Sequence, residues 1–150
     1  MTIRPATKKD EKAVRALVRR CHPGAPVPAP GFYTREHTTL VAEAEGQIIG
    51  YTVYRVLPEG PGIGQDLGVA PEWRRQGIAD QLYAARVAAM RAEGATHLIG
   101  LTRQDNAPMR KLIEAWGALP GTVMPGYYTD TDPPEDGIMY VLTFPKASHA

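Results

Sequence analysis

Apolar and polar residues along this chain follow two different periods, which predict where its strands and helices lie. Residues 38–44 and 47–57 are rich in Val, Ile, Tyr and Thr and flank Glu45-Gly46, a pattern typical of a β-hairpin. By the same criterion, further strands are expected at residues 3–5, 62–69, 97–102, 118–124 and 137–144.

Apolar residues recur at spacings of three and four elsewhere in the chain, and this spacing predicts helices. We expect one from about Lys9 to Arg20, one from Gly77 to Glu93, and one that follows a cap at Asp105 or Asn106. Prolines at positions 23, 26, 28 and 30 predict an irregular loop after the first helix. This order of elements predicts a mixed sheet flanked by helices, in one α/β or α+β domain that spans residues 1–150.

Composition narrows the classes of function. A chain of 150 residues, 43% hydrophobic and 22% charged, suits one globular domain, and a formal net charge of +1 argues against a nucleic-acid partner. Cys21 is the only cysteine and the four histidines are scattered, so no metal site is expected. No apolar run reaches the roughly 20 residues that cross a membrane, and residues 1–12 do not resemble a signal peptide. We therefore expect a cytoplasmic protein without a membrane partner.

The segment Arg74-Arg75-Gln76-Gly77-Ile78-Ala79 carries the strongest candidate chemistry. It lies between a predicted strand and a predicted helix, where backbone N–H groups converge and the helix dipole favours an anion. Gly77 allows a phosphate to approach closely, and Arg74 or Arg75 can add charge-assisted hydrogen bonds. The P-loop and dinucleotide fingerprints are both missing from the chain. The segment is a candidate pyrophosphate site, with a purely structural turn as the alternative.

The longer segment from Gln65 to Ala79, QDLGVAPEWRRQGIA, resembles the central motif of the GCN5-related N-acetyltransferases, the GNAT superfamily. The family signature is Arg or Gln, two residues, Gly, one residue, then Gly or Ala, which Arg74, Gly77 and Ala79 satisfy. The resemblance implies a mixed, mostly antiparallel sheet of about six to seven strands with about four flanking helices, and a V-shaped splay after the cofactor-pairing strand. It also implies acetyl-CoA as co-substrate and an amine as acceptor.

The resemblance assigns residues to the cofactor as well. The backbone of Leu67 and Val69 would pair with the pantetheine arm as an added strand, and residues 74–79 would hold the pyrophosphate. The segment from Asn106 to Ala118 resembles the second family motif, which implies that Asn106 reaches the pantetheine or its cysteamine end.

The family's proton-transfer residues are only partly matched. Ile113 occupies the position of a tyrosine thought to protonate the departing thiolate, and Leu101 that of a Glu or His base. Because an ammonium has no lone pair, a base must remove a proton before the amine can attack. We predict Asp66 as that base, directly or through water, and Tyr128 as the acid or a substrate-orienting group. The alternatives are a turn residue at a strand end and an ordinary strand aromatic.

The C-terminal part of the chain bears on the acceptor. Gly126-Tyr127-Tyr128, followed by the segment Glu135 to Met139, is similar to the ending of the N-terminal, ribosomal-protein-alanine type of acetyltransferase. The resemblance implies that Tyr127 helps to bind the acceptor, and Phe32 and Tyr33 are candidate walls of its pocket. The acidic residues between Asp130 and Asp136 could attract a cationic acceptor.

The sequence thus predicts an N-acetyltransferase, monomeric or homodimeric, that acetylates a protein or peptide amine or a small-molecule amine. One alternative is an acyl-CoA-binding regulatory module with weak or lost catalysis, which Leu101 and Ile113 favour. Another is an acceptor amine on a nucleotide or tRNA, against which the near-zero net charge argues.

Overall fold

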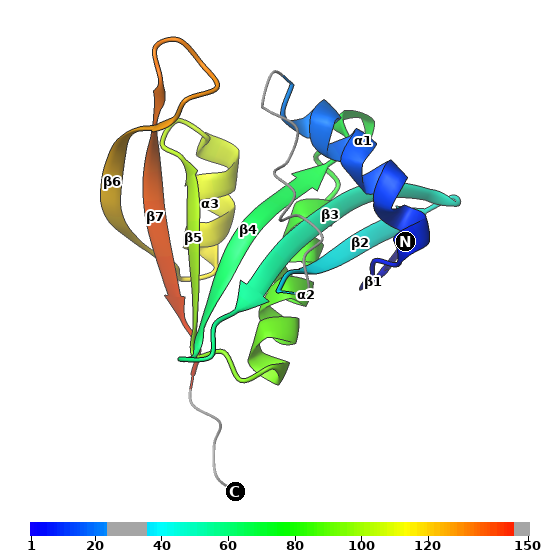
Figure 1. The fold of residues 1–150 in the computed structure, drawn as a ribbon, viewed down its shortest axis with the longest axis horizontal. Coiled ribbons are helices and arrows are strands. Elements are labelled where there is room, and N and C mark those ends of the chain that lie inside the picture. The colour runs from blue at the N-terminus through cyan, green and yellow to red at the C-terminus, as the bar shows by residue number, and fades with distance from the viewer. Residues whose placement is uncertain (24–35, 146–150) are drawn as a thin grey trace, which may run out of the picture. The chain divides into compact units, whose positions relative to one another are not determined.

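The computed structural model describes residues 1–23 and 36–145, and in them it shows a strand-rich fold with three α-helices (Figure 1). The chain divides into two compact units. The first comprises Met1–Arg55 and Gln65–Ala89, and the second comprises Val56–Gly64 and Met90–Ala150. Strand β4 (Pro61–Val69) and helix α2 (Ile78–Ala92) each contribute residues to both units. A single domain over residues 1–150 stays a prediction.

In the first unit, three strands pair antiparallel in chain order: β1 (Thr2–Pro5), β2 (Thr38–Ala44) and β3 (Gln47–Val56). The β2–β3 hairpin turns at Glu45 and Gly46, whose φ angles are 52° and 72°. Both central residues therefore have the left-handed conformation of a type I′ turn, the turn that matches the twist of a hairpin. The predicted hairpin is confirmed.

Helices α1 (Glu11–Cys21) and α2 pack against this sheet through separate apolar clusters. Neighbouring residues of a strand point to opposite faces, and in β2 Val41 joins the α1 cluster while Ala42 joins the α2 cluster. The α1 cluster contains Val14, Leu17, Val18, Val41, Tyr51, Val53 and Ala70, and the α2 cluster contains Ala42, Ile49, Val69, Ile78 and Leu82. The end of β4 is thus fixed between two helices.

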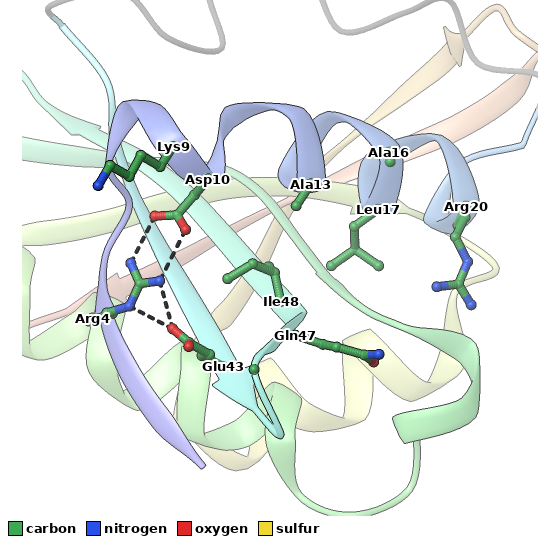
Figure 2. A pocket seen from close by; sticks show the side chains of 11 residues that line it. Arg4, Lys9, Asp10, Ala13, Ala16, Leu17, Arg20, Glu43, Gln47 and Ile48 are labelled. Atoms are coloured by element: carbon green, nitrogen blue, oxygen red, sulfur yellow. Dashed lines mark hydrogen bonds and ion pairs between the residues drawn. The ribbon is translucent and has the colours of Figure 1, made fainter.

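An ion-pair network joins the start of the chain to the hairpin, beside a groove of about 490 Å³ (Figure 2). Arg4 donates to both oxygens of Asp10 at 2.8 and 3.0 Å and to Glu43 Oε2 at 2.6 and 2.9 Å. Asp10 ends the 3-10 turn η1 (Lys8–Asp10) and also accepts the Thr7 N–H at 2.7 Å. Arg4, Asp10 and Glu43 line the groove and pair with one another, and these interactions stabilise the fold.

The second unit is built on strand β5 (His97–Arg103). The first half of β4 pairs with it in parallel, from Pro61 opposite His97 to Gly64 opposite Gly100. Strand β7 (Glu135–Thr143) pairs antiparallel with β5, and β6 (Leu119–Tyr128) pairs antiparallel with β7. Helix α3 (Ala107–Ala115) connects β5 to β6.

The strand order of the seven-stranded sheet is β1-β2-β3-β4-β5-β7-β6. This confirms the predicted mixed, mostly antiparallel sheet. The described residues contain three α-helices instead of about four, together with the short 3-10 turns η1 and η3 (Pro71–Trp73). The splay after the cofactor-pairing strand stays a prediction.

Strand β6 continues to Tyr128, although its predicted end was Met124. Pro125 and Gly126 follow the predicted end; proline cannot donate to a strand ladder, and Gly126 has a φ of 61°. As the last strand of the sheet, β6 has an edge on which a missing donor costs little, and its register shifts between Met124 and Tyr128. In the described part of the chain, no helix combines the length and apolarity needed to cross a membrane.

Candidate active site

The turn between β4 and α2 is exposed and strained. Arg75 and Gly77 have φ angles of 65° and 77°, in the left-handed region that L side chains rarely adopt. Arg75, Gln76 and Gly77 are all exposed, and a Cβ added at Gly77 would meet no heavy atom within 4 Å. Backbone strain of this kind gathers at ligand-binding sites.

The first backbone N–H groups of helix α2 have no partner within the helix. Its hydrogen bonding begins where the Gln81 N–H donates to the Gly77 carbonyl at 3.1 Å. The N–H groups of Ile78 and Ala79, which precede that bond, therefore have no acceptor inside the helix. With the positive end of the helix dipole, they form a site suited to a phosphate.

The two arginines of the turn differ in position. Arg74 Nε donates to the Val69 carbonyl at 3.1 Å, so this side chain ties the turn back to the end of β4. Both arginines are exposed, and Arg75 lies on the strained residue of the turn. The difference between them is that Arg74 Nε is engaged by the end of β4, so Arg75 is the better candidate of the two for contact with an anion.

The free edge of β4 carries the backbone groups assigned to the pantetheine arm. The Ala70 N–H donates to the Ile49 carbonyl of β3 at 2.8 Å. Since backbone groups alternate along a strand, those of Leu67 and Val69 point away from β3. The Leu67 N–H donates to Asp66 Oδ1 at 2.8 Å, and the Val69 carbonyl accepts from Arg74. A ligand that pairs with the Leu67 N–H must therefore displace the Asp66 carboxylate.

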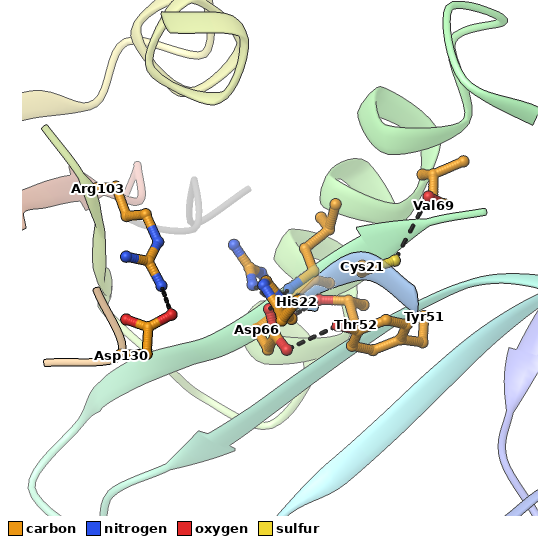
Figure 3. A network of polar contacts seen from close by, with 10 residues as sticks. Cys21, His22, Tyr51, Thr52, Asp66, Val69, Arg103 and Asp130 are labelled. Atoms are coloured by element: carbon orange, nitrogen blue, oxygen red, sulfur yellow. Dashed lines mark hydrogen bonds and ion pairs between the residues drawn. The ribbon is translucent and has the colours of Figure 1, made fainter. Parts of the chain in front are cut away.

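Asp66 is the centre of a polar cluster (Figure 3). The fully buried Tyr51 donates its hydroxyl to Asp66 Oδ2 at 2.7 Å, and His22 Nε2 lies 3.1 Å from Oδ1. Together with the Leu67 N–H, this gives the carboxylate three partners, and only 20% of its side chain is exposed. The role of Asp66 as a base stays a prediction, but its contacts are those of a residue that orients its neighbours.

His22 was missed in the sequence, where the histidines gave no ligand spacing. It follows the last turn of α1, and its N–H donates to the Val18 carbonyl at 2.9 Å. Asp66 is 44 residues away in the chain. The one local signal was a histidine at a helix end, just before the proline-rich segment.

Cys21 is not placed to act as a nucleophile. Burial raises the pKa of its thiol, although the nearby Arg74 opposes this shift. The thiol donates weakly to the Val69 carbonyl, with Sγ and O 3.5 Å apart. A protonated thiol does not attack a thioester, so the cluster offers no covalent acyl-cysteine step.

Arg86 of α2 lies beneath the Asp66 backbone and is only 6% exposed. Its Nη1 donates to Thr52 Oγ1 at 3.2 Å and contacts the Asp66 carbonyl at 3.5 Å, while Nε has no partner among the described residues. Burial lowers the pKa of this guanidinium. The nearby charge of Asp66 opposes this shift of the Arg86 pKa. The helical pattern gave no sign of a buried arginine.

The second unit holds the predicted acceptor residues around Arg103. This side chain pairs with Asp130 at 2.6 Å and Glu135 at 3.1 Å, and its guanidinium lies 4.3 Å from the centre of the Tyr128 ring. Tyr127 is exposed and packs edge-on against Tyr128, with ring centroids 5.1 Å apart. Arg103 thus contacts Tyr128, against which Tyr127 packs, and pairs with two carboxylates of the acidic stretch.

Asn106 caps helix α3, as one of the two predicted caps, since its Oδ1 accepts the Met109 N–H at 3.3 Å. Its contact with pantetheine stays a prediction. Ile113 is buried and Leu101 is half-buried. Phe32 and Tyr33 lie outside the described residues.

The predicted site residues therefore fall into two groups. The first unit brings together Asp66, Leu67, Val69 and the turn from Arg74 to Ala79, and the second holds Asn106, Tyr127 and Tyr128. Within residues 1–23 and 36–145, no cluster of three or more His, Cys, Asp or Glu side chains could hold a metal ion.

Comparisons with known proteins bear on the family and the fold. A model of the acetyltransferase (GNAT) family matches residues 11–118. A Bacillus subtilis (strain 168) protein named for ribosomal protein bS18-alanine N-acetyltransferase activity is 28% identical over 104 residues, which are 69% of this chain and 67% of the relative.

Solved structures share the fold. The ribosomal-protein-S18-alanine N-acetyltransferase from Escherichia coli has a TM-score of 0.88 at 23% identity, covering 98% of this chain and 96% of that one. A GNAT family acetyltransferase from Elizabethkingia anophelis, solved with acetyl-CoA bound, has a TM-score of 0.82 at 18% identity, covering 95% and 97%. Because the family match extends over well more than half of its length, this chain belongs to the GNAT acetyltransferase family and is an acyltransferase.

Proposed function

We propose that this protein transfers the acetyl group of acetyl-CoA to a primary amine, with the amine of a protein or peptide as the first candidate and a small-molecule amine as the second. The observation that carries the proposal is the strained, exposed turn that opens α2, in which Arg75 and Gly77 have positive φ angles. A negative pyrophosphate suits this turn because it offers backbone donors, a dipole end and a cation together.

The cofactor assignment uses two parts of the first unit. The turn would hold the pyrophosphate, and the edge of β4 at Leu67 and Val69 would pair with the pantetheine arm. Support comes from the outward direction of these backbone groups and from the E. anophelis relative, which was solved with acetyl-CoA. The Val69 carbonyl is held by Arg74, which fixes the turn and the edge in one arrangement.

The acceptor assignment uses the second unit. Two relatives are named for acetylation of a ribosomal-protein alanine, which has an α-amine. Tyr127 is exposed beside Tyr128, and a phenol can accept a hydrogen bond from an ammonium. Both observations favour a peptide amine.

The chemistry is direct transfer. The neutral amine attacks the thioester carbon, the C–S bond breaks, and CoA leaves as a thiolate that takes up a proton. Burial raises the pKa of the Cys21 thiol, whose Sγ lies 3.5 Å from the Val69 carbonyl oxygen, and both features favour this route over a covalent acyl-enzyme.

The test is acetyl-CoA turnover with a panel of amines: an alanine-led hexapeptide, a lysine peptide and spermidine. Arg75→Glu places a negative charge against phosphate, and we expect it to weaken CoA binding at least about tenfold, or 1.4 kcal/mol. Arg19→Glu makes the same charge change at an exposed position of α1 and is the matched control. Equal CoA affinity in both variants would contradict the cofactor assignment, and binding without transfer to any amine would contradict the activity.

A further inference from the structure

We propose that Arg86 and Thr52 are positioning residues that strengthen the Leu67 N–H as a hydrogen-bond donor to the thioester oxygen of acetyl-CoA. The inference rests on the proposed function and adds two buried side chains to the groups that carry it out. Neither side chain touches the substrate. Both act through the peptide group that joins Asp66 to Leu67.

A chain of hydrogen bonds runs from α2 through β3 to that peptide group. Arg86 Nη1 donates to Thr52 Oγ1 at 3.2 Å, and Thr52 Oγ1 donates to the Asp66 carbonyl at 2.9 Å (Figure 3). The direction of both bonds is fixed, because a guanidinium only donates, a carbonyl only accepts, and a hydroxyl has a single hydrogen to give. Arg86 Nη1 also lies 3.5 Å from the same carbonyl oxygen. A positive charge therefore acts on the carbonyl end of the peptide group.

The hydrogen-bond chain is shielded from water. Thr52 has no exposed surface, and Arg86 is 6% exposed. In such surroundings hydrogen bonds in series polarise one another, and a charge acts more strongly than it does in water. When the carbonyl of a peptide group is polarised in this way, its N–H becomes more positive. The Leu67 N–H is then a better donor than an ordinary backbone amide.

Packing alone does not explain an arginine at this position of α2. A buried guanidinium loses its hydration, and an apolar side chain at the same position would avoid that cost. The Tyr83 ring, whose centre lies 5.0 Å from Arg86 Cζ, replaces only part of the lost interaction. The Thr52 hydroxyl and the Asp66 carbonyl, which the guanidinium contacts, lead directly to the edge of β4.

The order of groups along acetyl-CoA indicates which edge donor meets the thioester. The pantetheine arm joins the pyrophosphate at one end to the thioester at the other. With the pyrophosphate at residues 74–79, Val69 is the nearer and Leu67 the farther of the two residues assigned to the arm. The thioester oxygen therefore pairs with the Leu67 N–H.

The place opposite the Leu67 N–H already accommodates a negative oxygen. Asp66 Oδ1 accepts this N–H at 2.8 Å, and acetyl-CoA must displace the carboxylate oxygen in order to pair there. Thr52 and Arg86 contact the carbonyl of Asp66 and not its carboxylate. Their effect on the peptide group therefore does not depend on where the carboxylate moves.

The strengthened donor acts on the charge that develops during transfer. The neutral amine attacks the thioester carbon, and an electron pair of the C=O bond moves onto the oxygen, which accepts from the Leu67 N–H. When the C=O bond forms again, the C–S bond breaks and CoA leaves as a thiolate. The nitrogen gives up one proton and the thiolate takes up one, so an amine and acetyl-CoA give an N-acetyl amide and CoA thiol. A donor that binds the oxyanion more strongly than the ground-state carbonyl accelerates the transfer.

The experiment compares Thr52→Val, which removes the hydroxyl and keeps the shape of the side chain, with Thr52→Ser, which keeps the hydroxyl. With an alanine-led hexapeptide as acceptor, we expect Thr52→Val to lower kcat about tenfold, because loss of the oxyanion donor itself costs about 100-fold or more. Thr52→Ser should keep kcat within about threefold, and Arg86→Met should lower it about tenfold or more. The affinity for CoA, which has no thioester oxygen, should stay within about twofold by calorimetry in all three variants.

An infrared measurement separates this role from a structural one. Difference spectra of bound acetyl-CoA, isotope-labelled at the thioester carbonyl carbon, report the hydrogen bond to the thioester oxygen. We expect the carbonyl stretch to move to a lower wavenumber on binding to the wild-type chain, and to move by less in Thr52→Val and Arg86→Met. Thr39→Val is the control, because it removes a buried threonine hydroxyl from the neighbouring strand β2. Its kcat and its carbonyl stretch should match those of the wild-type chain.

Equal losses of kcat in Thr52→Val and Thr52→Ser would overturn the inference, as would a carbonyl stretch or a kcat in Thr52→Val that matches the wild-type chain. Thr52→Val tests the hydrogen-bond chain even if Arg86→Met does not fold, because Thr52 lies between Arg86 and the carbonyl. If the wild-type chain binds acetyl-CoA but acetylates no amine of the panel, the proposed function fails, whereas the carbonyl stretch still reports the donor.

Discussion

Gly77 offers the sharpest test of where the cofactor binds, because Gly46 provides a matched control in the same unit. Their φ angles are 77° and 72°, and a Cβ added at either would meet no heavy atom within 4 Å. Alanine at either position therefore adds backbone strain without a steric clash, at a cost of about 1 kcal/mol. For a chain of this size, we expect Gly77→Ala and Gly46→Ala each to lower Tm by about 2–4 °C.

The two variants should differ only in their affinity for CoA. Gly46 lies at the tip of the β2–β3 hairpin, whereas Gly77 is the residue from which α2 starts. The added methyl group at Gly77 would fill the space into which a pyrophosphate must come to reach the N–H groups of Ile78 and Ala79. We expect Gly77→Ala to weaken CoA binding at least about tenfold, or 1.4 kcal/mol, and Gly46→Ala to weaken it less than about twofold.

The assay is isothermal titration calorimetry with CoA, beside thermal unfolding followed by circular dichroism. Thermal unfolding shows whether the added strain is equal in the two variants, and calorimetry shows whether CoA binding at the turn between β4 and α2 is affected. If Gly77→Ala binds CoA as tightly as Gly46→Ala while both lose the same stability, the pyrophosphate does not lie at this turn.

Two further variants test the supporting structure. Arg4 and the Thr7 N–H hold the pKa of Asp10 well below its usual range, so the stability that this carboxylate supplies is present above about pH 4 and is lost as pH falls through its lowered pKa. Asp10→Asn should lower the free energy of unfolding by about 1–2 kcal/mol at pH 7, measured by urea denaturation. If the difference in this free energy between the wild-type chain and the variant does not shrink below pH 3, the reasoning is wrong. Arg103→Gln should raise KM for the hexapeptide about fivefold or more and leave CoA affinity unchanged, because the Tyr128 ring loses its guanidinium partner; an unchanged KM would remove Arg103 from the acceptor site.

Local signals were enough to predict most elements of this fold. The residues Glu45-Gly46 determine a hairpin by their backbone preference alone, and Asn106 caps α3 through a contact three residues away. The β4–α2 turn was found in the same way, because its glycine and arginines are contiguous in the chain. A short stretch of sequence is enough to predict an element when the residues that interact in it are close together in the chain.

Contacts between distant segments could not be predicted in this way. His22 and Asp66 are 44 residues apart, and Arg86 and Thr52 are 34 apart. A buried arginine is also the opposite of what helical periodicity predicts, since a charged residue normally marks the solvent face. Arg86 remains inside because Thr52, the Asp66 carbonyl and the Tyr83 ring satisfy part of its guanidinium.

These distant contacts change the meaning of the missing proton carriers. Taken from the sequence alone, Leu101 favours a module that binds acyl-CoA without efficient transfer, because β5 has no base at that position. The structure instead places an imidazole and a carboxylate together at the end of α1 and on β4. The first unit carries the turn proposed to hold the cofactor, and the second carries the tyrosines proposed to hold the acceptor. Variants of that turn should then change CoA affinity, and variants of the tyrosines should change KM for the amine.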